Sequence, residues 1–171
     1  MPQVSATQWV PVTPATAFAV SQTTGAVRLA WDPFVRSQHL VDADRPGKGV
    51  RTVTRARVGL RMVSEYASYR PPTSVGMTMV SGPWFFASFG GGWRFAPEDR
   101  VLDGTAIAGT LATWKYSYAV RPDWLRPVAE PIGQWLLGRE IRARIAAFAL
   151  ACTDADVLAA AARDRRTDGT A

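Results

Sequence analysis

The sequence has little of the residues that most often build disulfides, metal centres and catalytic triads. It contains one cysteine and one histidine among 171 residues. A single cysteine excludes a disulfide framework within the chain. A single histidine argues against a histidine-based metal cage or a Ser/His/Asp triad unless His39 takes part. Because His39 lies near a predicted strand end beside a polar loop, we expect it on the surface, and we expect no metal site.

Long apolar runs are also missing. No stretch reaches the roughly eighteen apolar residues of a membrane span, and residues 1–12 lack a charged segment followed by an apolar run. We therefore expect a cytoplasmic protein with no membrane span. The three glycines at 90–92 are not followed by Lys and Ser or Thr, and they open a strand rather than a helix, so we expect neither a phosphate loop nor any cofactor.

Charge of one sign is in excess, but it is dispersed. The formal net charge is +6, from 20 basic and 14 acidic residues. Most of the basic residues are arginines spread along the chain, and the one tight run is Arg163, Arg165 and Arg166. This spread favours solvated faces over a nucleic-acid surface. Both a monomer and a dimer fit this composition.

The chain is long enough for one domain that buries roughly two thirds of its unfolded surface. A strand is predicted at Ser5–Val12. Thr13 then suits an N-cap and Pro14 a first helical residue, and a second short helix at Ala26–Trp31 ends before Pro33. Beyond Pro33, apolar residues recur at every second position, which predicts strands. Turns and a polar loop at 97–104 separate these strands. These strands cover 34–40, 50–58, 61–69, 74–81, 84–95 and a last strand ending at 118.

The stretch Asp123–Cys152 predicts a long helix, because apolar residues recur along it at spacings of three and four. They are Leu137, Ile141, Ile145, Phe148 and Cys152. Cys152 is therefore interpreted as a core residue. An earlier apolar set, Leu125, Val128, Ile132 and Leu136, lies on the opposite side. Because the apolar face changes sides near Gly138 and Pro131 removes a backbone donor, we predict two helical pieces. The second piece clasps the sheet with Arg139, Arg142 and Arg144 in solvent, and the first forms a pocket wall or lid with Trp124, Ile132, Trp135 and Leu136.

Alternation along the strands predicts which side chains face inward. In the strand at 50–58 the arginines face water and the small residues face inward. The inward set contains no charged residue; it is Thr52, Thr54, Met62, Ser64, Tyr66, Met77, Met79, Trp93, Phe95, Trp114, Tyr116 and Tyr118. These side chains either pack a core or line a roomy apolar pocket with a few orienting hydroxyls. A register shifted by one would instead turn three arginines inward.

The order of elements, together with several short motifs, resembles the SRPBCC or START-like superfamily, in particular its polyketide cyclase/dehydrase and lipid-transport group. The residues that carry the resemblance are Trp31–Asp32–Pro33–Phe34, Gly92–Trp93–Arg94–Phe95, Gly109–Thr110 and the helix from Pro122 to Cys152. It covers roughly residues 5–151, and one departure is the long stretch 96–108.

The resemblance implies an α+β helix-grip fold, in which a curved antiparallel sheet of about six to seven strands wraps around a long C-terminal helix, with two short helices after the first strand. Residues 1–152 would form this domain. Residues 153–171 would form a polar extension, with a short helix followed by an end that is disordered from Thr167.

The resemblance also implies an internal cavity for a hydrophobic small molecule. From the inward set and the first helical piece, we take thirteen residues as ligand-binding candidates: Thr54, Met62, Tyr66, Met77, Met79, Trp93, Phe95, Trp114, Tyr116, Tyr118, Ile132, Trp135 and Leu136. Three hypotheses follow. The chain is a non-catalytic binder of a lipid-like or aromatic molecule, or a polyketide aromatase/cyclase-type enzyme using Tyr66, Tyr116 or Ser64, or an interaction protein using its basic outer sheet face.

Overall fold

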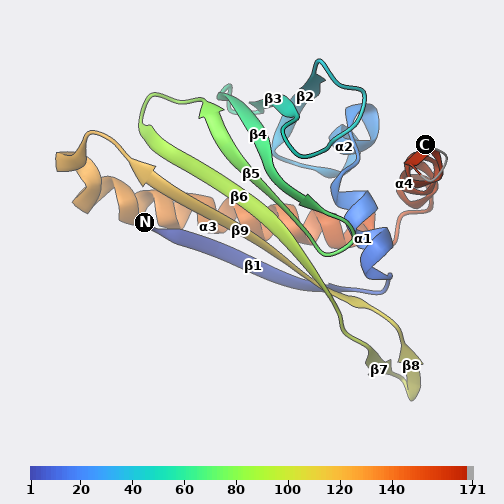
Figure 1. Ribbon diagram of the computed structural model, residues 1–171. Coiled ribbons are helices and arrows are strands. Elements are labelled where there is room, and N and C mark those ends of the chain that lie inside the picture. Colours follow the sequence, from blue (N-terminus) through green and yellow to red (C-terminus); the bar gives the residue numbers. More distant parts are fainter. Residues whose placement is uncertain (169–171) are drawn as a thin grey trace.

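The computed structural model describes residues 1–168 (Figure 1). Its helices are α1 (Pro14–Ser21), α2 (Gly25–Trp31), α3 (Arg126–Ala151) and α4 (Ala155–Asp168), with a 3-10 turn, η1 (Asp123–Leu125), before α3. Its strands are β1 (Gln3–Val10), β2 (Val35–Val41), β3 (Arg51–Ala56), β4 (Arg61–Arg70), β5 (Ser74–Ser81), β6 (Phe86–Pro97), β7 (Arg100–Leu102), β8 (Thr105–Ile107) and β9 (Thr110–Val120).

Seven of these strands form one antiparallel sheet in the order β1-β9-β6-β5-β4-β3-β2. The first strand lies beside the last, because the whole of β1 pairs with β9, from Gln3 opposite Ser117 to Val10 opposite Thr110. Helix α3 crosses the concave side of the sheet and packs against β1 and β9 (Figure 1). The curved sheet, the two short helices and the long C-terminal helix confirm the predicted helix-grip arrangement.

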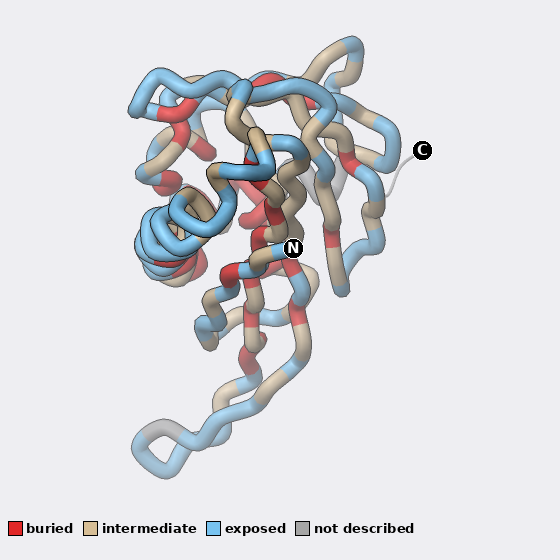
Figure 2. Tube along the Cα trace, turned by 90° about the vertical axis from the view of Figure 1, so that its left-hand side faces the viewer, coloured by how far each residue is buried: buried red, intermediate tan, exposed pale blue. Residues whose placement is uncertain are grey.

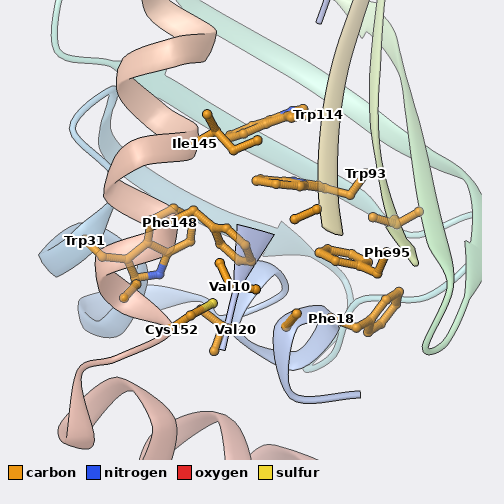
Figure 3. Close-up of a cluster of buried hydrophobic side chains, with 14 of the residues drawn as sticks. Val10, Phe18, Val20, Trp31, Trp93, Phe95, Trp114, Ile145, Phe148 and Cys152 are labelled. Atoms are coloured by element: carbon orange, nitrogen blue, oxygen red, sulfur yellow. The ribbon is translucent and has the colours of Figure 1, made fainter. Parts of the chain in front are cut away.

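The core lies where the second half of α3 meets β6 and β9 (Figure 3). The ring of Trp93 stacks on Trp114 with 4.0 Å between centroids, and Phe148 lies 4.7 Å from Trp93. Cys152 packs at the lower edge of this cluster, and burial raises the pKa of its thiol to about 12. Cys152 is 1% exposed within the buried cluster, which confirms its predicted core role. A thiol that resists ionisation is also a poor nucleophile.

The strand alternation follows the prediction. Arg51, Arg55 and Arg57 are exposed, while Thr52 and Ala56 are buried. On β9 every second side chain is buried, from Thr110 through Ala112, Trp114 and Tyr116 to Tyr118. His39 is exposed, also as predicted. The sheet therefore turns its arginines away from α3 and its aromatic residues toward it.

The triple glycine allows close approach between strands. The register of β6 against β5 and β9 runs unbroken across residues 90–92, so the glycines form no bulge. A Cβ atom on Gly91 would lie 2.9 Å from the Tyr116 ring, and one on Gly92 would lie 2.5 Å from the Val75 carbonyl oxygen. Glycine at these positions leaves room for the side chains that face α3.

Two predicted elements differ from the structure. The polar loop predicted at 97–104 is instead the hairpin β7–β8, whose turn residues Asp103 and Gly104 both have positive φ, as a two-residue type I′ turn requires. This hairpin projects from the body and is largely exposed (Figure 2). The predicted break in the long helix is also wrong. Helix α3 runs through Pro131 and Gly138, and because Pro131 lies exposed in the second turn, its missing donor removes a single bond near the helix start.

The C-terminal segment is helical and packed. Asp154 caps α4 by accepting hydrogen bonds from the backbone N–H groups of Asp156 and Val157. Helix α4 lies against α1, with Val157, Ala160 and Ala161 buried. The chain is helical to Asp168, past the predicted start of disorder at Thr167, and residues 169–171 lie outside the described part of the chain.

The core predicts a measurable contrast within α3. Phe148→Ala removes a fully buried ring from contact with Trp31, Trp93 and Phe95, and we expect it to lower the free energy of unfolding by about 3–5 kcal/mol. Leu150→Ala, on the exposed side of the same helix, should change it by less than about 0.5 kcal/mol. Urea denaturation followed by circular dichroism measures both, and equal losses would contradict this placement of the core.

Candidate ligand cavity

A cavity of about 710 Å³ lies between the concave face of the sheet and the first half of α3. Its volume is in the range of small-molecule sites. Of the fourteen residues named as ligand-binding or catalytic candidates, the structure brings eleven to the cavity wall: Thr54, Met62, Ser64, Tyr66, Met77, Met79, Trp93, Trp114, Tyr116, Ile132 and Leu136.

Three candidates lie elsewhere. Phe95 is packed in the core between Phe18 and Phe148. Tyr118 is fully buried, and its hydroxyl donates a hydrogen bond of 2.8 Å to the carbonyl oxygen of Glu130. Trp135 is exposed on the outer side of α3 and does not line the cavity. Strand alternation alone could not separate cavity wall from filled core, because both lie on the same face of the sheet.

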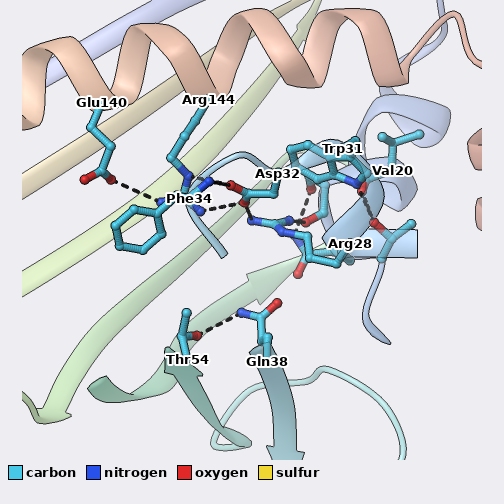
Figure 4. Close-up of polar contacts among 12 residues, drawn as sticks. Val20, Arg28, Trp31, Asp32, Phe34, Gln38, Thr54, Glu140 and Arg144 are labelled. Carbon is cyan, nitrogen blue, oxygen red and sulfur yellow. Dashed lines mark hydrogen bonds and ion pairs between the residues drawn. The ribbon is translucent and has the colours of Figure 1, made fainter. Parts of the chain in front are cut away.

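The inner end of the cavity is charged, which corrects the expectation of an uncharged interior (Figure 4). Asp32, at the end of α2, has no exposed surface and lies between Arg28 of α2 and Arg144 of α3. Both arginine side chains are only 8% exposed, and both line the cavity. The charges come from the helices, whereas the sheet register keeps its arginines outside as predicted.

Asp32 is held by a dense set of short contacts. Arg144 binds it through both carboxylate oxygens, with Nε 3.1 Å from Oδ1 and Nη2 2.7 Å from Oδ2. Arg28 Nη2 lies 2.8 Å from Oδ2, and the backbone N–H of Phe34 donates to Oδ1 at 3.1 Å. Bidentate pairing of this kind fixes geometry as well as charge. Asp32 therefore joins the α2–β2 corner to the second half of α3.

Aromatic rings complete the enclosure of the arginines. The guanidinium carbon of Arg144 lies 4.5 Å from the centre of the Phe34 ring and 4.2 Å from that of Trp114, and Arg28 lies 4.3 Å from the Trp31 ring. Guanidinium groups stack well on aromatic faces because they are planar and weakly hydrated. This explains how two cations are accommodated inside the protein beside one fully buried carboxylate.

The prediction that Arg144 lies in solvent is wrong, although Arg139 and Arg142 are exposed as predicted. A signal for its burial was present in the spacing. Arg144 lies three residues after Ile141 and four before Phe148, so it shares the apolar stripe of the helix. Arg28 and Asp32 give a weaker signal, since an oppositely charged pair four residues apart is also typical of an exposed helix.

The pKa values follow from this geometry. Burial by itself raises the pKa of Asp32, but the charges of Arg144 and Arg28 and the hydrogen bonds it accepts outweigh burial and hold the pKa below its usual value. Burial lowers the pKa of Arg144, but Tyr116 and Asp32 outweigh it and raise the pKa further. For Arg28, burial outweighs Asp32 and lowers the pKa. The pair Asp32–Arg144 is therefore fully ionised near neutral pH.

Tyr116 and Glu140 extend this cluster along the cavity wall. Arg144 Nη1 donates to the Tyr116 hydroxyl at 2.6 Å, and that hydroxyl donates to Glu140 Oε1 over a longer 3.4 Å. Burial raises the pKa of the Glu140 carboxyl, although Arg144 opposes this. Burial likewise raises the pKa of Tyr116 despite Arg144. The Tyr116 hydroxyl is therefore protonated and polarised by Arg144, and its own hydrogen bond to Glu140 is long and weak.

The rest of the cavity wall changes from polar near the charged end to apolar at the other end. Gln38 Nε2 donates to Thr54 Oγ1 at 3.1 Å near the charged end. The Tyr66 hydroxyl, whose pKa burial raises to about 12, makes no hydrogen bond to another described residue. Toward the other end the wall is formed by methionine, phenylalanine and aliphatic side chains, including Met62, Met79, Phe85, Phe86, Ile132 and Leu136. A molecule with one polar end and an apolar body matches this gradient.

A helix gripped by a curved sheet over an internal cavity defines a helix-grip domain. The sequence model of the family described as "Polyketide cyclase / dehydrase and lipid transport" matches residues 1–153. The chain therefore belongs to this family, which is of the SRPBCC type, as its motifs predicted. No curated protein sequence matches the chain significantly.

Solved structures share the fold at low sequence identity. XoxI from Bacillus cereus has a TM-score of 0.68 at 10% identity, covering 91% of this chain and 99% of its own. TTHA0849 from Thermus thermophilus has a TM-score of 0.68 at 17% identity, covering 94% and 99%. Ara h 8.0201 has a TM-score of 0.55 at 14% identity, covering 86% and 97%. At these identities the likeness establishes the fold alone.

None of the described helices, taken alone, has the length and apolar content of a membrane-spanning helix. The segments 123–151 and 155–163 pass that test of length and composition only when they are counted together, and they meet at an angle of 84°.

The buried cluster predicts a pH-dependent loss of stability. Asp32→Asn removes the charge that both arginines require, so we expect a loss of about 3–5 kcal/mol of unfolding free energy at neutral pH. Because the folded pKa of Asp32 is lowered, its contribution is present above the unfolded value of about 4 and is lost as the pH falls through the folded pKa. The difference between wild type and variant should therefore shrink below about pH 4.

Chemical denaturation across pH measures this difference, with the exposed Asp44→Asn as control. If the difference in unfolding free energy between wild type and Asp32→Asn stayed constant from neutral to acid pH, the assignment of an ionised Asp32 would be contradicted. An equally large loss of unfolding free energy in Asp44→Asn would show that removal of any carboxylate, rather than of the Asp32–Arg144 pair, is responsible.

Proposed function

We propose that this protein binds a hydrophobic or aromatic small molecule, lipid-like or polyketide-like, in the cavity between its sheet and α3. The observation that carries the proposal is a cavity of about 710 Å³ whose wall is largely apolar and contains three methionines. Methionine adapts to ligands of irregular shape, and apolar walls of this extent favour an apolar ligand body.

The polar end supports a more specific ligand. Tyr116 is polarised by Arg144 and donates to Glu140 at only 3.4 Å, so a carbonyl or phenol oxygen of the ligand can replace Glu140 as the acceptor. Tyr66 offers a second hydroxyl on the same wall. We therefore infer a ligand with an oxygen-bearing end placed against Tyr116 and an apolar body that extends toward Ile132 and Leu136.

A variant that fills the cavity tests this proposal. Ser64→Trp places a large ring into the cavity, whereas Ala67→Trp places the same ring on an exposed position of the same strand. We expect the apolar dye 1-anilinonaphthalene-8-sulfonate to bind wild type and Ala67→Trp alike, and Ser64→Trp at least roughly ten-fold more weakly. Native mass spectrometry of the wild-type protein from its own host should show a co-purifying small molecule.

Unchanged dye binding by Ser64→Trp, with a circular dichroism spectrum like that of wild type, would contradict binding in the cavity. Wild-type protein that neither binds the dye nor carries a co-purifying molecule would contradict the function itself.

One observation favours a second candidate function, a polyketide cyclase-type enzyme. A tyrosine hydroxyl 2.6 Å from an arginine and in reach of a carboxylate can polarise a ligand carbonyl, while Glu140 exchanges a proton. Shape and orientation in the cavity would supply the remainder of the catalysis. The outer arginine face gives weaker support to an interaction role, since Arg51 is already paired with Glu65 at 3.1 Å.

The enzyme reading predicts that Tyr116→Phe abolishes the conversion of a poly-β-ketone mimic while dye binding persists, because the ring remains and only the donor is lost. Tyr66→Phe tests the second hydroxyl in the same assay, with product followed by liquid chromatography. A wild-type protein that binds the mimic and leaves it unchanged would assign the cavity to binding alone.

A further inference from the structure

The open end of the cavity carries an unusual amount of exposed apolar surface. It is contributed by the β3–β4 turn, the β5–β6 connection, η1 and the first turns of α3. We call this set the mouth rim; its members are Val58, Leu60, Trp84, Trp124, Val128, Ile132 and Leu136. Five of them also line the cavity. Trp84 lies between two cavity-lining residues, Pro83 and Phe85, and Trp124 directly precedes another, Leu125.

The two rim tryptophans are among the most exposed apolar side chains described. Trp84 is 70% exposed and Trp124 is 79% exposed. Their segments lie together at one end of the sheet, where the backbone N–H of Arg121 donates to the Phe85 carbonyl oxygen at 2.9 Å and the Arg121 side chain donates to the Trp84 carbonyl oxygen. Figure 2 looks onto this end and shows the exposed outer surface of α3. These hydrogen bonds fix the segments of the two tryptophans relative to each other, so the mouth rim is a contiguous apolar surface rather than a set of scattered residues.

Arginines surround the rim. Arg57 and Arg61 flank the turn that carries Val58 and Leu60, and Arg121 precedes η1. All three are exposed, and none forms an ion pair with another described residue. Arg61 also lies directly opposite Arg55 in the β3–β4 register, a like-charged arrangement that lowers stability unless an anion lies nearby.

Acidic residues at the rim are few and partly neutralised. Asp123 pairs with Arg126 at 3.1 Å, and Glu130 lies 3.9 Å from the same arginine. The rim therefore combines exposed tryptophan and aliphatic side chains with an excess of positive charge. Tryptophan favours the boundary between water and lipid, and arginine is attracted to anionic headgroups.

We propose that the mouth rim docks onto an anionic lipid bilayer, with Trp84 and Trp124 in the headgroup region and Arg57, Arg61 and Arg121 on anionic lipids. Docking would place the open end of the cavity at the apolar phase, so that a hydrophobic ligand could enter or leave without crossing water. The docking itself requires no bound ligand, so its test is independent of the function proposed above.

The experiment is co-sedimentation of the full chain with vesicles of phosphatidylcholine alone and of phosphatidylcholine mixed with phosphatidylglycerol, at low and moderate salt. We expect wild type to bind the mixed vesicles more strongly and to lose affinity with salt. Arg57→Gln combined with Arg61→Gln should weaken that binding roughly ten-fold or more. Arg36→Gln combined with Arg94→Gln removes the same charge from the exposed outer face of the sheet and should change it by less than about two-fold.

The apolar contribution is tested separately. Trp124→Ser should weaken binding to the mixed vesicles by roughly ten-fold, while Leu150→Ser, 72% exposed at the other end of α3, should leave it unchanged. Dye binding by the rim variants reports whether the cavity remains intact, and Ser64→Trp should still dock although its cavity is filled.

Three outcomes would overturn the inference. The first is no binding of wild type to the mixed vesicles at low salt. The second is an equal loss of vesicle binding in the Arg57/Arg61 and Arg36/Arg94 double variants, which would show that binding depends on net charge rather than on the mouth rim. The third is a dimer in analytical ultracentrifugation that Trp124→Ser dissociates, without vesicle binding, which would assign the rim to a second copy of the chain.

Discussion

The ion pair between Asp32 and Arg144 is the interaction on which the arrangement of the helices and the cavity depends. It joins two residues that are 112 positions apart in the chain, and it fixes the α2–β2 corner against the second half of α3. A fully buried carboxylate is costly unless it is paired and hydrogen-bonded. Here two arginines and a backbone N–H satisfy it, and the rings of Phe34 and Trp114 enclose Arg144.

This pair also divides α3 into two functional parts. Beyond it, Ile145 and Phe148 pack against the sheet aromatics and close that end of the grip. Before it, the helix contacts β9 where the Tyr118 hydroxyl donates to the Glu130 carbonyl oxygen, and its other side borders the cavity, with Ile132 and Leu136 more than half exposed. A single continuous helix therefore serves as core at one end and as cavity wall at the other, because the charged cluster spans the transition.

The same charged cluster makes one end of the cavity polar and leaves the other end apolar. Arg144 lines the cavity beside the Tyr116 hydroxyl to which it donates, and Glu140 accepts from that hydroxyl at a longer distance. The polar groups are thus concentrated at the enclosed end, while the apolar groups and the two exposed tryptophans lie toward the mouth. An apolar ligand body and a lipid surface would be accommodated at the same end for the same reason, namely that water is least well bound there.

Local patterns in the sequence predicted most of the helices and strands, and the resemblance to a known family predicted their arrangement. Thr13 and Pro14 start α1, the proline after Asp32 ends α2, and the period of two in residues 50–81 sets which strand faces point inward, since each signal depends on a few neighbouring residues. The spacing of Leu137 to Cys152 likewise determined the buried face of the long helix. The charged interior was decided only by tertiary structure. Arg28 and Asp32 resemble an ordinary pair of helix charges, and the spacing of Arg144 indicates burial without identifying its partner. No local period encodes the contact of 2.7 Å between Arg144 and Asp32. Which inward aromatics fill the core and which border the cavity depended equally on where α3 crosses the sheet, a property of the packed molecule.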